Sequence, residues 1–225
     1  MEPQVRKDPA GFPMIQVEPR MFVHWLPVTK IQFEHFLCDA HDRSFDAGWY
    51  DRVLKLNPRV TPKKITAANY WNAFMSGLLP TEAQRFAFWC GDGYRLPSAA
   101  EWARIYQFFS GQTAMALDQV KGLNDLPTRI GDLVQHTEAA AADAASQLGY
   151  ERRLADQMLM RLGVLEWVSA QERWGAMGEP FPDLCGNLLA PEIGEPAFPR
   201  QPPDHPEIAR LPRFGFRLIF VEGNS

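Results

Sequence analysis

Arg95-Leu96-Pro97-Ser98-Ala99-Ala100-Glu101-Trp102 is the stretch of sequence that predicts most about the fold. Ser98 and Glu101 have the spacing of a capping box, in which each side chain accepts a hydrogen bond from the other residue's backbone N–H. Pro97 restricts the backbone beside that cap. The stretch therefore predicts a helix that begins after Ser98. Its apolar face is formed by Trp102, Ile105, Tyr106 and Phe109.

The same signal predicts two earlier helices, one beginning at Thr29 with Gln32 and one at Thr81 with Gln84. The apolar residues that follow recur at helical spacing: Phe33, Phe36, Leu37 and Ala40 in the first helix, and Ala83, Phe86, Ala87 and Cys90 in the second. Gly91 suits the left-handed backbone that ends many helices, so we expect the second helix to stop there.

Outside these helices, the apolar and β-prone runs predict strands over residues 22–28, 164–169, 184–189 and 214–221. Residues 44–62 are charged and aromatic without a period, which predicts an irregular loop. Residues 65–79 fit either a helix or a packed loop. Helices in the first half and strands in the second are typical of an α+β fold.

Residues 111–161 are rich in Ala, Leu and Met, and they predict a helical insertion within a single domain that spans residues 1–225. One apolar stripe contains Leu126, Ile130, Leu133 and Val134, and a second contains Leu154, Met158 and Leu162. Gly149 is expected to break the helix between them. These stripes suit packing either on the domain itself or on a helix of a partner.

The composition narrows the class of function. The net charge is -4 and no stripe of Lys and Arg is present, which disfavours nucleic acid as a partner. No apolar run approaches the ~20 residues that a membrane span needs, and no signal peptide is evident, so we expect a cytoplasmic protein. The 3 cysteines are widely spaced, which argues against a disulfide framework and a zinc site.

Five stretches together resemble the formylglycine-generating-enzyme (sulfatase-modifying-factor) family. In chain order they are LPVT with QF at residues 26–33, the helix at 83–91, RLPSAAEW at 95–102, VLEWV at 164–168 and GFRL at 215–218. The resemblance covers about residues 20–110 and 162–221. It implies a C-type-lectin-like domain with two main helices, a small twisted antiparallel sheet and long loops.

The resemblance also implies a chemistry that this chain is expected to lack. Enzymes of the family bind copper with two cysteines that precede the terminal GFR strand, because soft thiolates suit Cu(I). Residues 187–214 contain no cysteine. The family's calcium-site Asn is replaced by Gly163, and the insertion supplies only His136 where iron-dependent relatives use several histidines. We therefore expect no cofactor.

Single residues within these motifs have simpler interpretations. Cys38 and Cys90 lie on apolar helix faces and are predicted to be core residues. Cys185 is predicted to lie on a strand, as either a small buried side chain or a lone redox or metal residue. Glu166 alternates away from Trp167 and is a candidate partner for Arg95 or Arg217.

In diversified binding proteins of the family, the region before the GFR strand varies and contacts ligand. That implies a candidate partner-binding surface here, formed by Trp174, Phe181, Phe198, Arg200, His205, Arg210 and Arg213. Trp and Arg often carry binding energy. Trp174 and Phe181 also fit a plug for the loop core. Met158 joins the surface if its face of the insertion is exposed, since Met-rich faces adapt to partners.

The first hypothesis is a non-catalytic protein-binding or complex-assembly module, of the kind found as a subunit in bacterial multi-protein systems. The second is a copper- or iron-dependent oxidase or oxygenase whose rewired site uses Cys185 and histidines. The third is a lectin-like or diversified ligand-binding protein, whose loop over residues 191–212 would vary among close relatives.

Overall fold

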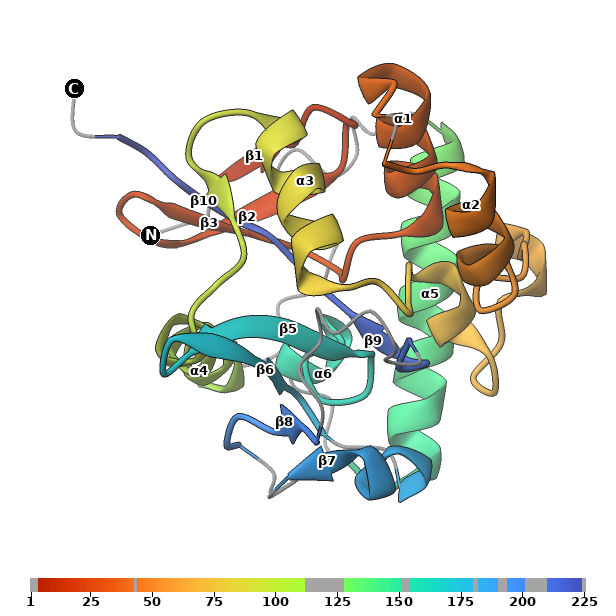
Figure 1. Cartoon of the computed structure of the whole chain (residues 1–225). Coiled ribbons are helices and arrows are strands. Elements are labelled where there is room, and N and C mark those ends of the chain that lie inside the picture. The colour runs from red at the N-terminus through yellow and green to blue at the C-terminus, as the bar shows by residue number, and fades with distance from the viewer. Residues whose placement is uncertain are drawn as a thin grey trace.

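The computed structural model describes residues 4–42, 44–111, 128–150, 154–179, 182–189, 194–200 and 210–223. Over these residues the chain combines six α-helices with several small sheets, which confirms the predicted α+β class (Figure 1). None of the described helices is both long and apolar enough to cross a lipid bilayer.

The largest sheet has five strands in the order β1-β2-β3-β10-β4, and all its pairings are antiparallel. Its strands are β1 (Val5–Lys7), β2 (Pro13–Glu18), β3 (Met21–His24), β4 (Tyr94–Arg95) and β10 (Ile219–Val221). The last strand therefore lies between two strands from the first half of the chain (Figure 1). The sequence patterns did not predict β1 and β2.

Helices α1 (Lys30–Ala40), α3 (Pro80–Cys90) and α4 (Ala99–Ser110) correspond to the three predicted helices. The capping boxes at Thr29 and Ser98 are confirmed. The box predicted at Thr81 is wrong, because the helix begins two residues earlier with Pro80 in its first turn. There the Glu82 carboxylate accepts a hydrogen bond from the Leu79 backbone N–H at 2.8 Å.

The prediction of an irregular loop over residues 44–62 is wrong in its centre, where α2 (Ala47–Leu54) forms. Asp46 caps this helix by accepting a hydrogen bond from the Trp49 backbone N–H at 2.7 Å. Short 3-10 turns follow, η1 (Pro62–Lys64) and η2 (Tyr70–Ala73), so residues 65–79 form a packed loop with one turn.

A second sheet contains β5 (Leu165–Ala170), β6 (Arg173–Met177) and β9 (Phe214–Gly215), in the order β6-β5-β9. Because β5 and β9 are parallel, this sheet departs from the predicted all-antiparallel arrangement. The strand predicted over residues 214–221 divides into β9 and β10, which belong to different sheets. Between them, the backbone carries Arg217 into the core.

Beneath this sheet, η4 (Pro182–Asn187) leads into β7 (Leu188–Leu189), which pairs with β8 (Phe198–Pro199). The strand predicted over residues 184–189 is therefore mostly a 3-10 helix. Figure 1 shows β7 and β8 at the lower end of the molecule, below β6.

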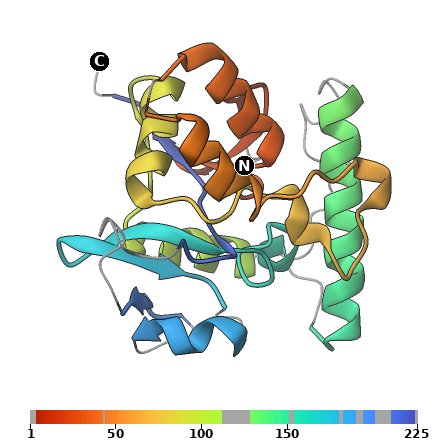
Figure 2. The same cartoon turned by 45° about the vertical axis from the view of Figure 1, so that its right-hand side comes forward.

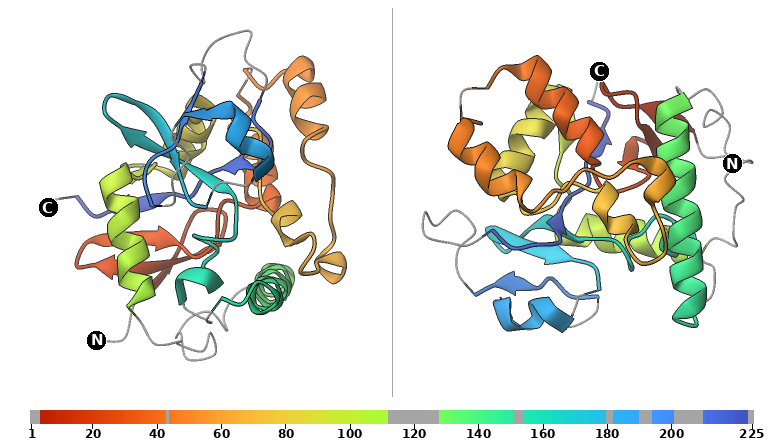
Figure 3. Two further views of the ribbon diagram at one scale, coloured as in Figure 1. Left: turned by 90° about the horizontal axis from the view of Figure 1, so that it is seen from below. Right: turned by 90° about the vertical axis from the view of Figure 1, so that its right-hand side faces the viewer.

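The predicted insertion contains α5 (Thr128–Gln147) and the short α6 (Leu154–Gln157). Figures 2 and 3 show α5 lying lengthwise along one side of the domain, next to the segment that holds η1 and η2. The described part of the insertion packs on its own domain through the buried face of α5. That face consists of Leu133, Val134, Thr137, Glu138, Ala140, Ala141, Ala144 and Ala145. Gly149 follows the helix with φ 73°, as predicted. Leu126 lies outside the described residues.

Candidate functional site

Three of the stretches that carry the family resemblance meet in one buried polar group. Glu166 on β5 accepts hydrogen bonds from Trp102 Nε1 at 2.9 Å and from Arg217 Nε at 2.7 Å. Arg217 Nη2 reaches the second carboxylate oxygen at 2.7 Å, so the pairing is bidentate. Both charged side chains have 0% exposure. The predicted pairing of Glu166 with Arg217 is confirmed.

The remaining donors of Arg217 are also satisfied. Nη1 donates to the carbonyls of His24 and Trp25 at 3.1 Å and 3.5 Å, and Nη2 donates to the carbonyl of Met158 at 2.7 Å. A buried charge costs free energy unless it is both paired and hydrogen-bonded. This group therefore joins β3, α4, β5, the insertion and the segment between β9 and β10, and its role is to stabilise the fold.

Arg95, the alternative partner considered for Glu166, pairs instead with Glu101 at the surface. Its guanidinium contacts both carboxylate oxygens, at 2.7 Å and 2.6 Å. The hydrogen bonds from Arg95 and Ser98 lower the pKa of Glu101 to about 2, against an opposing effect of burial. The RLPSAAEW stretch thus caps α4 and ties the preceding strand β4 to it.

Three of the predicted partner-binding residues lie near one another: Trp174 on β6, Phe198 on β8 and Arg200 directly after β8. Ala176 and Ala197 bridge these two strands. Trp174 is half-buried and packs against the core cluster that contains Trp167, which matches the interpretation of a core plug. Phe198 is half-buried and Arg200 is exposed.

Phe198 is held between an arginine and the backbone. The Arg173 guanidinium carbon lies 3.6 Å from the centre of the Phe198 ring, and the same ring packs closely over Gly175. Leu189 is paired directly opposite Phe198 in the β7–β8 register, and it is 41% exposed. We call Arg173, Leu189, Phe198 and Arg200 the β6–β8 face.

The two arginines of the β6–β8 face contact a backbone carbonyl and an aromatic ring, not carboxylates. Arg200 Nε donates to the carbonyl of Gly186 at 2.9 Å. Arg173 stacks on Phe198. Across the described ranges of the chain, neither guanidinium lies within ion-pair distance of a carboxylate. Sequence reasoning missed Arg173 and Leu189, because only the register of β7 and β8 brings them to Phe198.

Arg210 has a structural role that its sequence position did not reveal. Its Nη1 and Nη2 each approach the Glu82 carboxylate at 2.6 Å, and Nη1 also donates to the carbonyl of Gly77 at 3.0 Å. Trp49 Nε1 donates to the same carboxylate at 2.6 Å. Arg210 therefore fastens the segment before β9 to α2 and α3, and we remove it from the candidate surface.

Arg213 lies beside a hollow at the C-terminal half of α5. Its guanidinium carbon is 4.9 Å from the centre of the Trp71 ring, and Trp71 lines this hollow of about 410 Å³. The polar groups of the hollow largely satisfy one another. Arg161 pairs with Glu179 at 3.0 Å, and the Tyr150 hydroxyl donates to Glu179 at 3.1 Å.

The other predicted surface residues do not join the β6–β8 face. Phe181 and His205 lie outside the described residues. Met158 has 0% exposure and Met160 has 1%, because both pack into the core between the insertion and the sheet. Met158 was predicted to contact a partner only if its face of the insertion were exposed. Because it is buried, we remove it from the candidate surface.

The cysteines differ from one another in setting. Cys90 is buried, as predicted, and burial raises the pKa of its thiol. The prediction for Cys38 is wrong, because its side of α1 is exposed. Cys185 is half-exposed on η4 and not on a strand. Within the described ranges, no group of three or more His, Cys, Asp or Glu side chains is arranged to hold a metal ion.

The β6–β8 face presents apolar area and arginine charge without a carboxylate partner together at the surface. No family model, curated protein or solved structure matches this chain.

Proposed function

We propose that this chain is a non-catalytic protein-docking module built on a C-type-lectin-like domain of the formylglycine-generating-enzyme type. The buried group of Trp102, Glu166 and Arg217 supports the proposed family. These residues come from three separate stretches that resemble it, and their side chains meet in one hydrogen-bonded cluster. Motifs that matched only by chance would have no reason to converge.

The proposed lack of catalysis rests on the cysteines in the sequence. The family's oxygen chemistry needs two thiolates on one copper ion. Residues 187–214, which precede the GFR strand, contain none, and Cys185 just before them supplies a single thiol. One thiol cannot provide the pair of soft ligands, which favours a binding role over an oxidase.

The β6–β8 face is the observation that carries the docking proposal. An arginine stacked on a phenylalanine ring combines two residue types that are enriched at protein interfaces, and the exposed leucine beside them adds apolar area. Arg173 and Arg200 bring two positive charges that lack carboxylate partners in the described structure. The complementary partner is a protein segment with an apolar side chain flanked by carboxylates.

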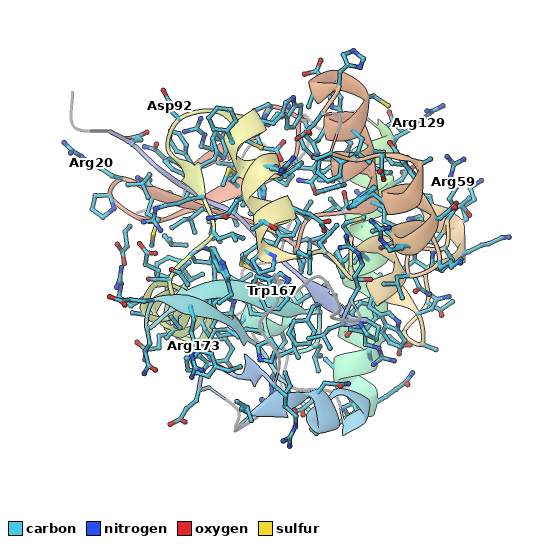
Figure 4. The ribbon with its side chains drawn as sticks, in the orientation of Figure 1. Arg20, Arg59, Asp92, Arg129, Trp167 and Arg173 are labelled. Atoms are coloured by element: carbon cyan, nitrogen blue, oxygen red, sulfur yellow. The ribbon has the colours of Figure 1, made fainter. Side chains whose placement is uncertain are left out.

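Site-specific photo-crosslinking in the source cells tests this proposal. A photo-reactive residue at Leu189 is expected to form an adduct with a protein partner, whereas the same residue at exposed Arg129 on α5 is not. Arg173 and Arg129 lie at opposite sides of the molecule (Figure 4). Because the face attracts through charge, Arg173→Glu should weaken the captured partner's affinity at least about tenfold, and Arg129→Glu should not.

Two outcomes would contradict the proposal. The first is a protein that stays a solitary monomer in cell extract and forms no adduct at Leu189. The second is stoichiometric copper or iron in the purified protein that is lost on Cys185→Ser. That second result would favour the oxidase alternative.

A further inference from the structure

A hollow of about 300 Å³ lies between α1 and α2, and the proposed docking function does not use it. Its apolar wall consists of Phe33, Leu37, Trp49, Val53 and Met75, and its polar lining consists of Lys30, Glu34, Cys38, Tyr50, Asn57 and Arg59. Arg59 marks this side of the molecule at the right of Figure 4, away from Arg173 on β6. The volume suits a ligand of about one ring.

One face of α1 presents its reactive groups to this hollow. Lys30, Glu34 and Cys38 follow one another at intervals of one helical turn, so their side chains share a face. Lys30 is half-buried, and its Nζ donates a hydrogen bond to the carbonyl of Pro58 at 2.6 Å. An ammonium group has three N–H donors, and this carbonyl uses one of them.

The charges around Lys30 compensate its ammonium group poorly. Glu34 is shared with Arg59, at 3.9 Å, and the side chains of that pair are 55% and 92% exposed, so water screens it. Burial lowers the pKa of Lys30 to about 8, although Glu34 pulls it upward. Near neutral pH a much larger share of the Lys30 amine is therefore neutral than for an ordinary lysine, whose pKa is about 10.4.

We propose that Lys30 is a carbonyl-capture site, which takes small apolar aldehydes into the α1–α2 hollow and binds them as an imine. The lone pair of Nζ attacks the carbonyl carbon and forms a C–N bond. The two protons of the neutral amine pass to the carbonyl oxygen, which leaves as one water molecule when the C=N bond forms. No oxidant or reductant is consumed, and hydrolysis reverses the step.

The hollow selects the aldehyde by its shape and polarity. Phe33, Leu37 and Val53 can cover an apolar ring while the carbonyl group points to the rim. Tyr50 also lines the hollow, and burial moves the pKa of its hydroxyl further above neutral pH. Water-exposed lysines such as Lys63 and Lys64 have no such wall.

Reductive trapping tests the proposal on the whole protein. The protein is incubated with benzaldehyde and cyanoborohydride near neutral pH, and the modified lysines are identified by peptide mass spectrometry. Because a neutral amine is the nucleophile, Lys30 should be labelled at least about tenfold faster than Lys63 and Lys64. Lys30→Met should remove that fast product. Labelling of Lys30 at the rate of the exposed lysines would overturn the proposal.

A variant that fills the hollow tests whether the hollow binds the aldehyde or whether Lys30 is only a more reactive amine. Leu37→Trp should fill the hollow, so that benzaldehyde labels Lys30 about tenfold more slowly while formaldehyde labels it as before. Equal effects on both aldehydes would overturn the role of the hollow. If this variant does not fold, benzyl alcohol serves as a competitor on the native protein. It should protect Lys30 from benzaldehyde, and an absence of protection would overturn the same role.

Discussion

At the residue scale, the buried pair of Glu166 and Arg217 shows how this chain tolerates full charges in its core. Removing the two ions from water costs several kcal/mol each. Trp102 supplies one further donor to the carboxylate, and the backbone carbonyls of His24, Trp25 and Met158 receive the three remaining guanidinium N–H groups. Because every polar group of the pair has a hydrogen-bond partner, the pair specifies which segments of the chain pack together. It does so even if its net contribution to the free energy of unfolding is small.

Removing one member of this pair is therefore expected to be worse than removing both. Glu166→Gln should destabilise the protein by about 3–5 kcal/mol, because the Arg217 charge stays buried without its counterion. The double variant Glu166→Leu with Arg217→Met should lose less stability than Glu166→Gln alone, because it leaves no buried charge without a counterion. Urea unfolding at neutral pH measures these free energies.

The exposed pair of Arg95 and Glu101 is the control for that experiment. Their side chains are 48% and 15% exposed, so water screens the interaction. Glu101→Gln should therefore cost only about 1 kcal/mol, mostly through the weakened capping box. Similar losses for the two glutamate variants would contradict the structural distinction between the pairs.

At the element scale, α5 brings one ionisable group into the interior. Glu138 is buried, and its carboxyl accepts a hydrogen bond from Trp25 Nε1. Burial raises the pKa of Glu138 to about 8 from an ordinary value of 4.5, and the bond from Trp25 only partly opposes this. Near neutral pH the folded protein therefore holds this carboxyl mostly protonated.

This burial predicts a pH dependence with a definite sign. The unfolded chain releases the Glu138 proton near pH 4.5 and the folded chain only near pH 8, so stability falls as pH rises between them. The loss is at most about 1.4 kcal/mol per pH unit. Glu138→Gln keeps the acceptor for Trp25 without the titration, so its stability relative to the native chain should rise over this window.

Chemical denaturation of both proteins across this pH range measures the difference. The two stabilities should be similar near pH 4.5 and should diverge progressively toward pH 8. Parallel curves over the whole range would show that Glu138 titrates normally, and that α5 does not bury it in solution.

At the scale of the whole molecule, the insertion and the rest of the chain share one core. The α5 residues Leu133 and Ala141 belong to the same apolar cluster as Trp25 and Trp102. Arg217 on the final segment also donates to the carbonyl of Met158, which follows α6. The contacts between insertion and domain therefore resemble contacts within one domain, and separate folding of the two parts is not expected.

We therefore expect α5 to open only when the whole protein unfolds. Native-state hydrogen exchange should give the amides of residues 133–145 the same opening free energy as those of β2 and β3, because all of them pack on one core. Exchange of α5 at a free energy several kcal/mol lower, with β2 and β3 still protected, would show that the insertion is a separate unit.

Local signals in the sequence predicted much of this fold. The helix starts at Thr29 and Ser98 were predicted because capping involves residues only three apart. Thr81 offered the same pattern, but Pro80 and Glu82 supplied a better start. The capping box paired Glu101 with Ser98, but it did not predict that Glu101 also pairs with Arg95.

The candidate site was less accessible to such reasoning. Phe198 and Arg200 were identified by residue type, but Arg173 and Leu189 reach them only through strand pairing. Lys30 and Arg59 line one hollow because two helices pack, and neither residue is distinctive in sequence. Arg210 was assigned to a binding surface, whereas a distant glutamate holds it in place.

The sequence by itself determined the α+β class, the places where two helices begin and the absence of cysteine between residues 187 and 214. Those features depend on composition and on neighbours within a few residues. Only the tertiary structure decided that the last segment divides between two sheets and that α5 covers the core. Such features depend on contacts between residues far apart in the chain, whose free energies no local pattern contains.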